Sequence, residues 1–141
     1  GLGGSSPPVS VMKIVTDKIT IKELKKMTEK MFGNLVKAAV DIEKEIMAVD
    51  GELHADEMEL LVESGSRYEN IWGINIYPTA IPQPRRTSGA EPSMREIETE
   101  DWLEYDSMIN LKPILGNRTR GIDNPEIKEK IIKIVNKLIK R

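Results

Sequence analysis

The chain has 141 residues, of which 39% are hydrophobic and 31% charged, a composition typical of one globular domain. It has no cysteine, which excludes disulfides, cysteine-ligated zinc, iron–sulfur clusters and thiol catalysis. The net charge of −2 gives no footprint for nucleic acid, and no apolar run is long enough to span a membrane, so we expect a cytoplasmic protein.

The first eleven residues are rich in Gly, Ser and Pro and lack any periodic pattern. We expect residues 1–11 to be a disordered leader or tag, followed by a single α+β domain at 12–141. Residues 12–15 are short and apolar, which suits an edge strand. Residues 78–101 hold four prolines and three arginines, which predicts a long mobile loop.

Two helices have clear start signals. Thr20 and Glu23 have the spacing of a capping box, which predicts a helix over 21–32. Asn124 followed by Pro125 predicts the start of a last helix, in which apolar residues recur at helical spacing: Ile127, Ile131, Ile134 and Leu138.

Alternating apolar and polar residues predict strands over 35–49, 52–63, 71–77 and 102–111. Asp50-Gly51 is a strong hairpin signal between the first two. A β-bulge near Asp56-Glu57 would keep the later apolar residues of the second strand on the core face. The predicted fold is therefore α+β, a four- to five-stranded antiparallel meander with an N-terminal and a C-terminal helix packed on one face.

This register predicts a sheet with one apolar and one acidic face. The core face would carry Ala38, Val40, Ile42, Ile46, Ala48, Leu53 and Ala55. The opposite face would carry Asp41, Glu43, Glu45, His54 and Asp56, joined by Asn75, Glu104, Asp106 and Asn110 from the later strands. The charge is locally uneven, since residues 41–63 contain nine acids and one lysine, whereas residues 126–141 contain six basic residues and two acids.

Acids are depleted in strands and facing like charges repel, so something is expected to offset this face. A divalent cation such as Mg²⁺, Mn²⁺ or Zn²⁺ is one candidate, held by His54, Asp41, Glu43, Glu45 and Asp56. The chain's own arginines are a second candidate: Arg85, Arg86, Arg95, Arg118 and Arg120. A basic protein partner or another copy of the chain is the third. A single histidine such as His54 is more often a structural hydrogen-bond donor than a ligand.

Two functions of different class follow. The first is a non-catalytic binding or regulatory domain that uses the acidic face or an exposed strand edge. The second is a divalent-metal-dependent hydrolase or related enzyme, with the His54 and carboxylate set around the ion and Asn75, Asp106 and Asn110 lining the site. The first is favoured, because no motif specifies a nucleophile, a base or a substrate pocket.

Three stretches carry a family resemblance: VKAAVDIEKEIMAVDGELHADEMELLVESGS, IWGINIYP and WLEYDSMINLKP…GNRTRGI…NPEIKEKIIKIVN. They resemble a family of small prokaryotic proteins classed only as a domain of unknown function. The resemblance covers most of the chain from Met12 to Lys140 and departs at 79–100, where the connection is longer in this chain. It implies a prokaryotic cytoplasmic protein and carries no activity, cofactor or catalytic residue.

Overall fold

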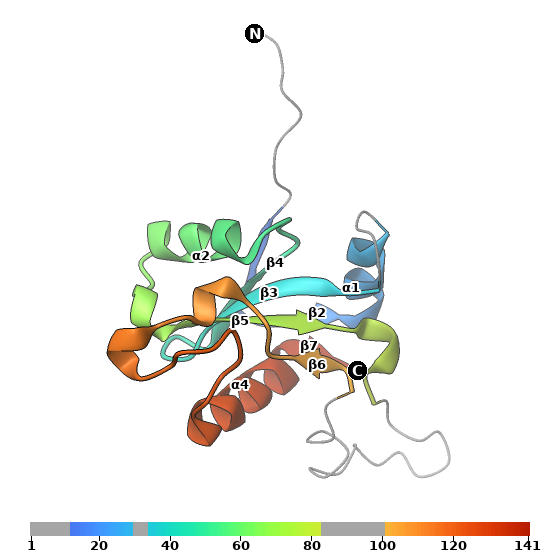
Figure 1. Ribbon diagram of the computed structural model, residues 1–141. Coiled ribbons are helices and arrows are strands. Elements are labelled where there is room, and N and C mark those ends of the chain that lie inside the picture. Colours follow the sequence, from blue (N-terminus) through green and yellow to red (C-terminus); the bar gives the residue numbers. More distant parts are fainter. Residues whose placement is uncertain (1–11, 30–33, 83–100) are drawn as a thin grey trace, which may run out of the picture.

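The computed structural model describes residues 12–29, 34–82 and 101–141 (Figure 1). Its strands are β1 (Lys13–Val15), β2 (Ile19–Thr20), β3 (Val36–Asp41), β4 (Ile46–Val49), β5 (Ile71–Ile76), β6 (Leu103–Glu104) and β7 (Ile139–Lys140). Its helices are α1 (Ile21–Thr28), α2 (His54–Glu63) and α4 (Pro125–Leu138), with 3₁₀ turns η1 (Tyr68–Asn70), η2 (Pro78–Ala80), η3 (Met108–Asn110) and η4 (Pro113–Leu115). The expected leader at 1–11, the predicted helix end at 30–32 and residues 83–100 of the predicted loop lie outside the described residues.

Five strands form one antiparallel sheet in the order β1-β4-β3-β5-β6. Together with α1 near the start and α4 near the end of the described chain, this confirms the predicted α+β class. The order departs from a simple meander in one respect, because β5 pairs with β3 and not with β4. The connection from β4 to β5 contains α2, and it carries the chain across the sheet to the other side of β3.

The hairpin between β3 and β4 turns at residues 42–45, so that Asp41 lies opposite Ile46. The prediction of one strand over 35–49 that turns at Asp50-Gly51 is therefore wrong. Asp50-Gly51 instead begins the loop that leads from β4 into α2.

The Asp41 side chain accounts for the earlier turn. Its Oδ1 accepts hydrogen bonds from the backbone amides of Glu43 at 2.8 Å and Lys44 at 3.0 Å, while the Asp41 carbonyl accepts from the Glu45 amide at 2.9 Å. An aspartate that bonds to the amides that follow it closes a turn by itself. Glu45 completes the turn with a φ of 58°.

The predicted return strand over 52–63 and its bulge near Asp56-Glu57 are also wrong, because residues 54–63 form a helix. The segment is rich in Ala, Glu, Met and Leu, all of which favour helices. Its buried positions are spaced three and four residues apart, which places them on one helical face: His54, Glu57 and Leu61.

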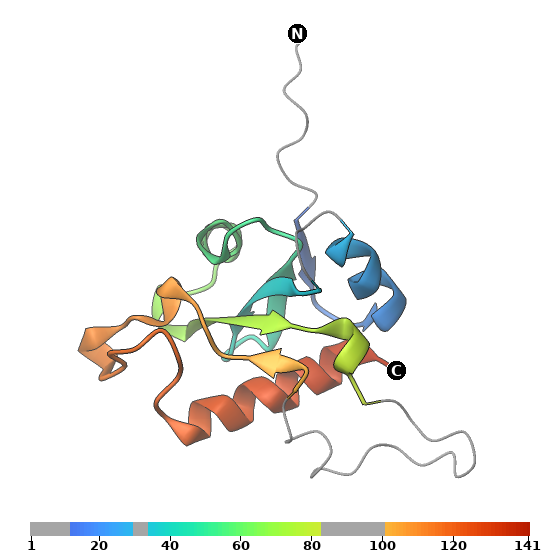
Figure 2. The same ribbon diagram turned by 45° about the vertical axis from the view of Figure 1, so that its right-hand side comes forward.

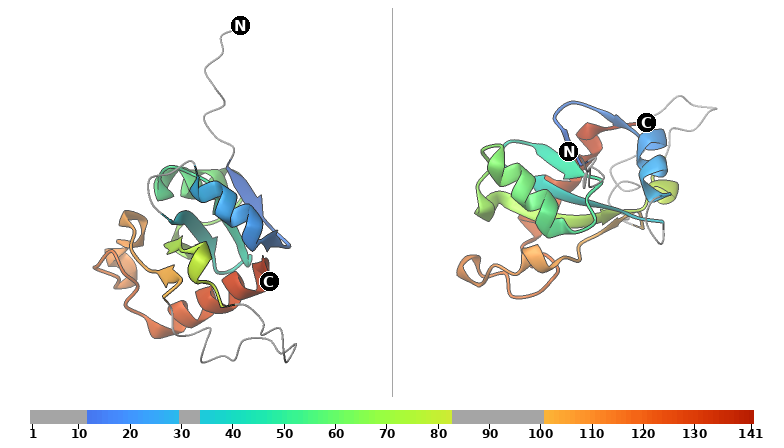
Figure 3. Two further views of the ribbon diagram at one scale, coloured as in Figure 1. Left: turned by 90° about the vertical axis from the view of Figure 1, so that its right-hand side faces the viewer. Right: turned by 90° about the horizontal axis from the view of Figure 1, so that it is seen from above.

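Helices cover both faces of the sheet, with α2 and α4 on opposite sides (Figures 1 and 2). The main core lies between α1, α4 and one sheet face, as the fold prediction expected, and includes Val36, Ala38, Val40, Met47, Val49, Trp72, Ile74 and Ile76. A smaller core lies under α2 on the second face and contains Ala39, Ala48, Leu61, Ile71 and Ile109. Seen from above, α2 lies over the strands (Figure 3).

The early turn also changes the predicted core. Ala38 and Val40 face the main core as expected. Ile46 and Ala48 belong to the α2 side instead, because a turn at 42–45 reverses which residues of β4 share a face with those of β3.

The two ends of the described chain meet in a parallel pair, in which Ile19 lies opposite Ile139 and Thr20 opposite Lys140. Thr20 also caps α1, because its Oγ1 accepts from the amide of Glu23 at 3.1 Å and lies 3.3 Å from the Glu23 side chain. The capping box is therefore confirmed.

The last helix begins as predicted. Asn124 Oδ1 accepts from the amide of Glu126 at 2.8 Å, and Pro125 occupies the first helical position. The stripe that faces the core includes the predicted Ile131, Ile134 and Leu138.

Only two residues of the predicted strand over 102–111 pair in the sheet, as β6. Beyond them the chain turns into η3. There the side chain of Asn110, and not the backbone of a strand, makes hydrogen bonds to the backbone of β5. Its Oδ1 accepts from the Gly73 amide at 2.7 Å and its Nδ2 donates to the Gly73 carbonyl at 3.0 Å. This close approach requires a glycine, because a Cβ at Gly73 would lie 2.5 Å from Ser107 Oγ.

Gly73→Ala is expected to lower the free energy of unfolding by about 1–3 kcal/mol, the usual cost of overpacking. Urea denaturation measures the change. Gly121→Ala is the matched control, because its Cβ would meet its nearest atom, the Tyr105 carbonyl oxygen, at 3.4 Å. We expect the control to stay within about 0.5 kcal/mol of the parent. Equal effects of the two substitutions would contradict the close packing of η3 on β5.

Candidate functional site

The structure distributes the predicted metal set over two separate places. Asp41 ends β3, Glu43 and Glu45 lie in the turn that follows, and His54 and Asp56 lie in the first turn of α2. Within residues 12–29, 34–82 and 101–141, no three His, Asp or Glu side chains gather into a group that could hold a metal ion. The predicted shared face depended on a strand over 52–63, which the chain does not form.

Two of the three acids of the first group have structural partners. Asp41 is buried, and its Oδ1 is occupied by the two turn amides. Glu45 is exposed and pairs with Lys137 of α4, with 2.8 Å between Oε1 and Nζ. Glu43 is exposed in the same turn. These contacts fasten the β3–β4 turn to the last helix.

His54 is buried at the start of α2, and its Nε2 lies 2.8 Å from the carbonyl oxygen of Ile74. A carbonyl only accepts, so Nε2 carries the proton and Nδ1 is the bare nitrogen of the neutral ring. Burial lowers the pKa of His54, against the opposing effect of this hydrogen bond. His54 therefore ties α2 to β5, in the manner of a structural histidine.

Three of the residues predicted on the acidic face do come together beside β5. Asn75 Nδ2 donates to Glu104 Oε1 at 2.8 Å and lies 3.4 Å from the Asp106 carbonyl oxygen. Tyr77 also donates to Glu104, at 3.2 Å, and Arg120 pairs with the Asp106 carboxylate at 2.8 Å. The chain's own donors thus partner both acids in this cluster. Burial and the adjacent Glu104 raise the pKa of Tyr77.

Asn110, predicted to line a binding surface, is fully buried. Besides its two bonds to Gly73, its Nδ2 donates to the Arg120 carbonyl at 2.9 Å. Its carbonyl in turn accepts from Asn117 Nδ2 at 2.7 Å. Asn110 therefore holds the chain around residues 105–121 against β5.

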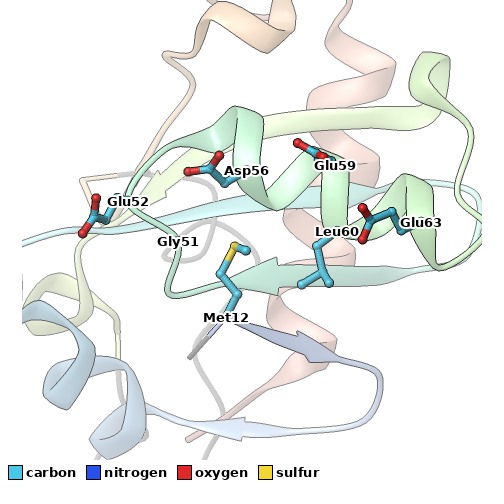
Figure 4. Close-up of a pocket in the computed structure, with 7 residues that line it drawn as sticks. All are labelled: Met12, Gly51, Glu52, Asp56, Glu59, Leu60 and Glu63. Atoms are coloured by element: carbon cyan, nitrogen blue, oxygen red, sulfur yellow. The ribbon is translucent and has the colours of Figure 1, made fainter. Parts of the chain in front are cut away.

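An acidic hollow lies on the exposed side of α2 (Figure 4). It has a volume of about 340 Å³ and is lined by Met12, Gly51, Glu52, Asp56, Glu59, Leu60 and Glu63. All four acids are exposed, and no basic residue of the described chain lines it. Met12 and Leu60 lie between the helix and the edge of the sheet, so the hollow combines apolar walls with a carboxylate rim (Figure 4).

Of the acids in the hollow, only Asp56 was among the predicted site residues. Glu52, Glu59 and Glu63 were assigned to the predicted strand over 52–63 and were not among the predicted site residues. Their helical spacing was the signal, because Asp56, Glu59 and Glu63 recur at intervals of three and four residues and so share one side of a helix.

Glu57 lies behind this hollow and is fully buried. Its Oε2 accepts from the Gly51 amide at 2.9 Å, and its Oε1 has no hydrogen-bond partner among the described residues. Burial raises the pKa of Glu57 well above its usual value. A Cβ at Gly51 would lie 2.6 Å from Glu57 Cγ, so a glycine is needed for this contact between the loop and α2.

Comparisons with known proteins identify a family but no activity. One family model, described as a protein of unknown function (DUF5674), matches residues 13–138. No curated protein and no solved structure matches the chain.

The described part of the chain contains no helix with the length and apolar character needed to cross a membrane.

The substitution Glu57→Gln tests whether the buried carboxyl of Glu57 is protonated in the folded protein. The unfolded chain loses this proton near the ordinary pKa of 4.5, whereas the folded chain retains it to higher pH. Between the two pKa values the folded state binds more protons, so this group's contribution to the free energy of unfolding falls as pH rises. Glutamine removes that contribution and keeps an acceptor for the Gly51 amide. We therefore expect the variant to gain stability relative to the parent as pH rises above 4.5.

Urea denaturation over a series of pH values measures the difference between the two proteins. Glu63→Gln, at an exposed position on the same helix, is the control. Its difference in free energy of unfolding from the parent should not grow with pH. A difference between Glu57→Gln and the parent that stays constant with pH would show that Glu57 is not protonated in the folded protein.

Proposed function

The chain belongs to the DUF5674 family, and we propose that it is a non-catalytic binding domain that recognises a basic protein partner through the acidic hollow of α2. The observation that carries this proposal is the lining of the hollow: four exposed carboxylates around apolar walls, with no described cation among them.

The charge of the hollow favours a cationic partner because its four acids act together. Each exposed ion pair contributes only about 0.2–1 kcal/mol, so no single acid would hold a partner. Four carboxylates around one concavity act together, because like charges at a hollow focus the local potential and speed the approach of opposite charge.

The apolar walls of the hollow indicate which cationic groups of a partner would fit it. Met12 and Leu60 present apolar surface beside the acids (Figure 4). A lysine or arginine side chain matches this arrangement, because its aliphatic stem packs on apolar surface while its charged head reaches a carboxylate. A protein segment with exposed lysines or arginines is therefore the partner that we infer.

A second copy of the chain is one source of such a segment. On α4, Lys130, Lys133 and Lys137 line another hollow together with Glu45. Docking of α4 from one copy on α2 of another would join the two oppositely charged helices. Sedimentation velocity over a concentration series distinguishes this arrangement from recognition of a different protein.

The metal-dependent hydrolase stays a prediction, and the geometry gives it less support. Turn amides occupy one oxygen of the Asp41 carboxylate, Oδ1, and His54 points its protonated nitrogen at a backbone carbonyl. Thermal unfolding after chelator dialysis, with and without Mg²⁺, Mn²⁺ or Zn²⁺, tests it directly. A rise in the midpoint that disappears in His54→Ala would replace the present proposal with a metal site.

Binding of a fluorescein-labelled lysine-rich peptide, followed by fluorescence anisotropy, tests the proposed surface. We expect binding that weakens with salt, and a loss of about three- to tenfold in affinity in the double variant Glu59→Gln/Glu63→Gln, since each exposed pair contributes a fraction of a kcal/mol.

The double variant Glu43→Gln/Glu126→Gln is the matched control, because it removes the same charge from exposed positions outside the hollow. Equal losses in both variants would show attraction by overall charge alone. Absence of peptide binding at low salt would rule out the proposed surface.

A further inference from the structure

Lys112 is a buried lysine on a side of the molecule that plays no part in the proposed function. Only 3% of its surface is exposed. Its Nζ donates to the Tyr68 carbonyl at 3.1 Å, lies 3.6 Å from the centroid of the Tyr68 ring, and is 5.3 Å from that of Trp72. An ammonium group in such surroundings gains cation–π attraction but little hydration.

The Lys112 ammonium has no carboxylate partner among the described residues. Glu69 is the nearby acid, and its carboxylate pairs with Arg67 at 3.1 Å. Burial lowers the pKa of Lys112 to about 8, with only partial compensation from the charge of Glu69. A buried cation without a counter-ion is costly, and an anion of suitable size would relieve that cost.

A hollow of about 370 Å³ opens beside Lys112, and its lining is mainly apolar: Tyr68, Glu69, Lys112, Pro113, Ile114 and Leu115. Ile114 is 99% exposed and Leu115 is 51% exposed. Two neighbouring aliphatic side chains held in water beside a hollow are typical of a binding surface. The volume falls in the range of small-molecule sites.

The loop that carries these side chains is held firmly. Lys112 and Asn117 bond to each other through both backbone groups, with N–O distances of 2.9 and 3.1 Å. Gly116 closes the loop with a φ of +84°, which a side chain would strain. Asn117 Nδ2 also donates to the Gly121 carbonyl at 2.8 Å. The exposure of Ile114 is therefore imposed by an anchored loop.

We propose that this hollow binds a small monocarboxylate with an apolar body, whose carboxylate pairs with Lys112 Nζ while the body packs on Tyr68, Ile114 and Leu115. A single buried cation matches a single negative charge. The apolar lining would leave the second charge of a phosphate monoester without a partner. A charge-assisted hydrogen bond in such surroundings is among the stronger polar contacts. This site shares no residue with the acidic hollow, so the failure of either proposal leaves the other standing.

Matched acid and amide probes test the inference: hexanoate against hexanamide, and 3-phenylpropanoate against 3-phenylpropanamide. Titration into the ¹⁵N-labelled protein is followed by chemical-shift changes at the amides of Tyr68, Lys112 and Ile114. We expect each acid to bind at least about tenfold more tightly than its amide, since hydrogen bonds to charged groups contribute about 1.5–3 kcal/mol. Acetate, which lacks the apolar body, should bind more weakly than either acid.

Two variants separate the roles of charge and apolar surface. Lys112→Met should abolish the preference for acid over amide, whereas Ile114→Ser should weaken acid and amide alike. Ile114 is almost fully exposed, so its replacement leaves the fold intact even where Lys112→Met does not. Lys133→Met, at an exposed lysine that lines a different hollow, is the control and should keep the full preference.

Three results would overturn the inference. The first is no shift at the three amides with millimolar acid, and the second is equal affinity for acid and amide. The third is a dimer in sedimentation velocity that Ile114→Ser dissociates, which would assign the loop to contact between copies.

Discussion

A row of three small residues across the second face of the sheet decides where α2 lies. Ala39, Ala48 and Gly73 present little more than backbone there, so α2 and η3 approach closely enough to bury Leu61 and Ile109. The position of α2 then sets the other features of that side. It brings His54 to the Ile74 carbonyl, places Glu57 against Gly51, and turns the acidic side of the helix outward. A larger residue at Ala39 or Ala48 would push the helix away from the sheet, and one at Gly73 would displace Ser107 and Ile109.

The elements that sequence reasoning predicted correctly are those whose signals are local. The Thr20 cap, the Asn124-Pro125 start and the alternation over β5 depend on neighbours within a few residues. The α2 segment is different, because two of its buried positions are polar. With His54 and Glu57 facing the core, the helical apolar stripe is interrupted, and a period of two fits the remaining residues nearly as well. The partners that make those polar residues tolerable, Ile74 and Gly51, could not be identified before the fold was known.

The predicted site residues illustrate the same limit. Asp41 and Asn110 have the composition of a binding site, yet both use their side chains to satisfy backbone groups. Short polar side chains serve turns and strand ends as readily as ligands, and the sequence pattern is the same in either role. Conversely, Lys112 carried no sequence signal, since its surroundings come from Tyr68 and Trp72, which the fold brings to it. The grouping of the acids into a hollow likewise became visible only when residues 54–63 were helical.

The parallel pair of β2 and β7 places a constraint on the order in which the chain can complete its fold. Residues 19 and 20 find their strand partners at 139 and 140, so during synthesis β2 stays unpaired until residues 139 and 140 have emerged from the ribosome. Thr20 belongs both to this pair and to the cap of α1, so the N-terminal helix gains its full support last. Contacts so distant in sequence slow folding, because the loop between them must close first. A ribosome-bound chain that stops short of residue 139 therefore leaves β2 without its strand partner, and an unpaired strand edge is a surface to which a chaperone can bind.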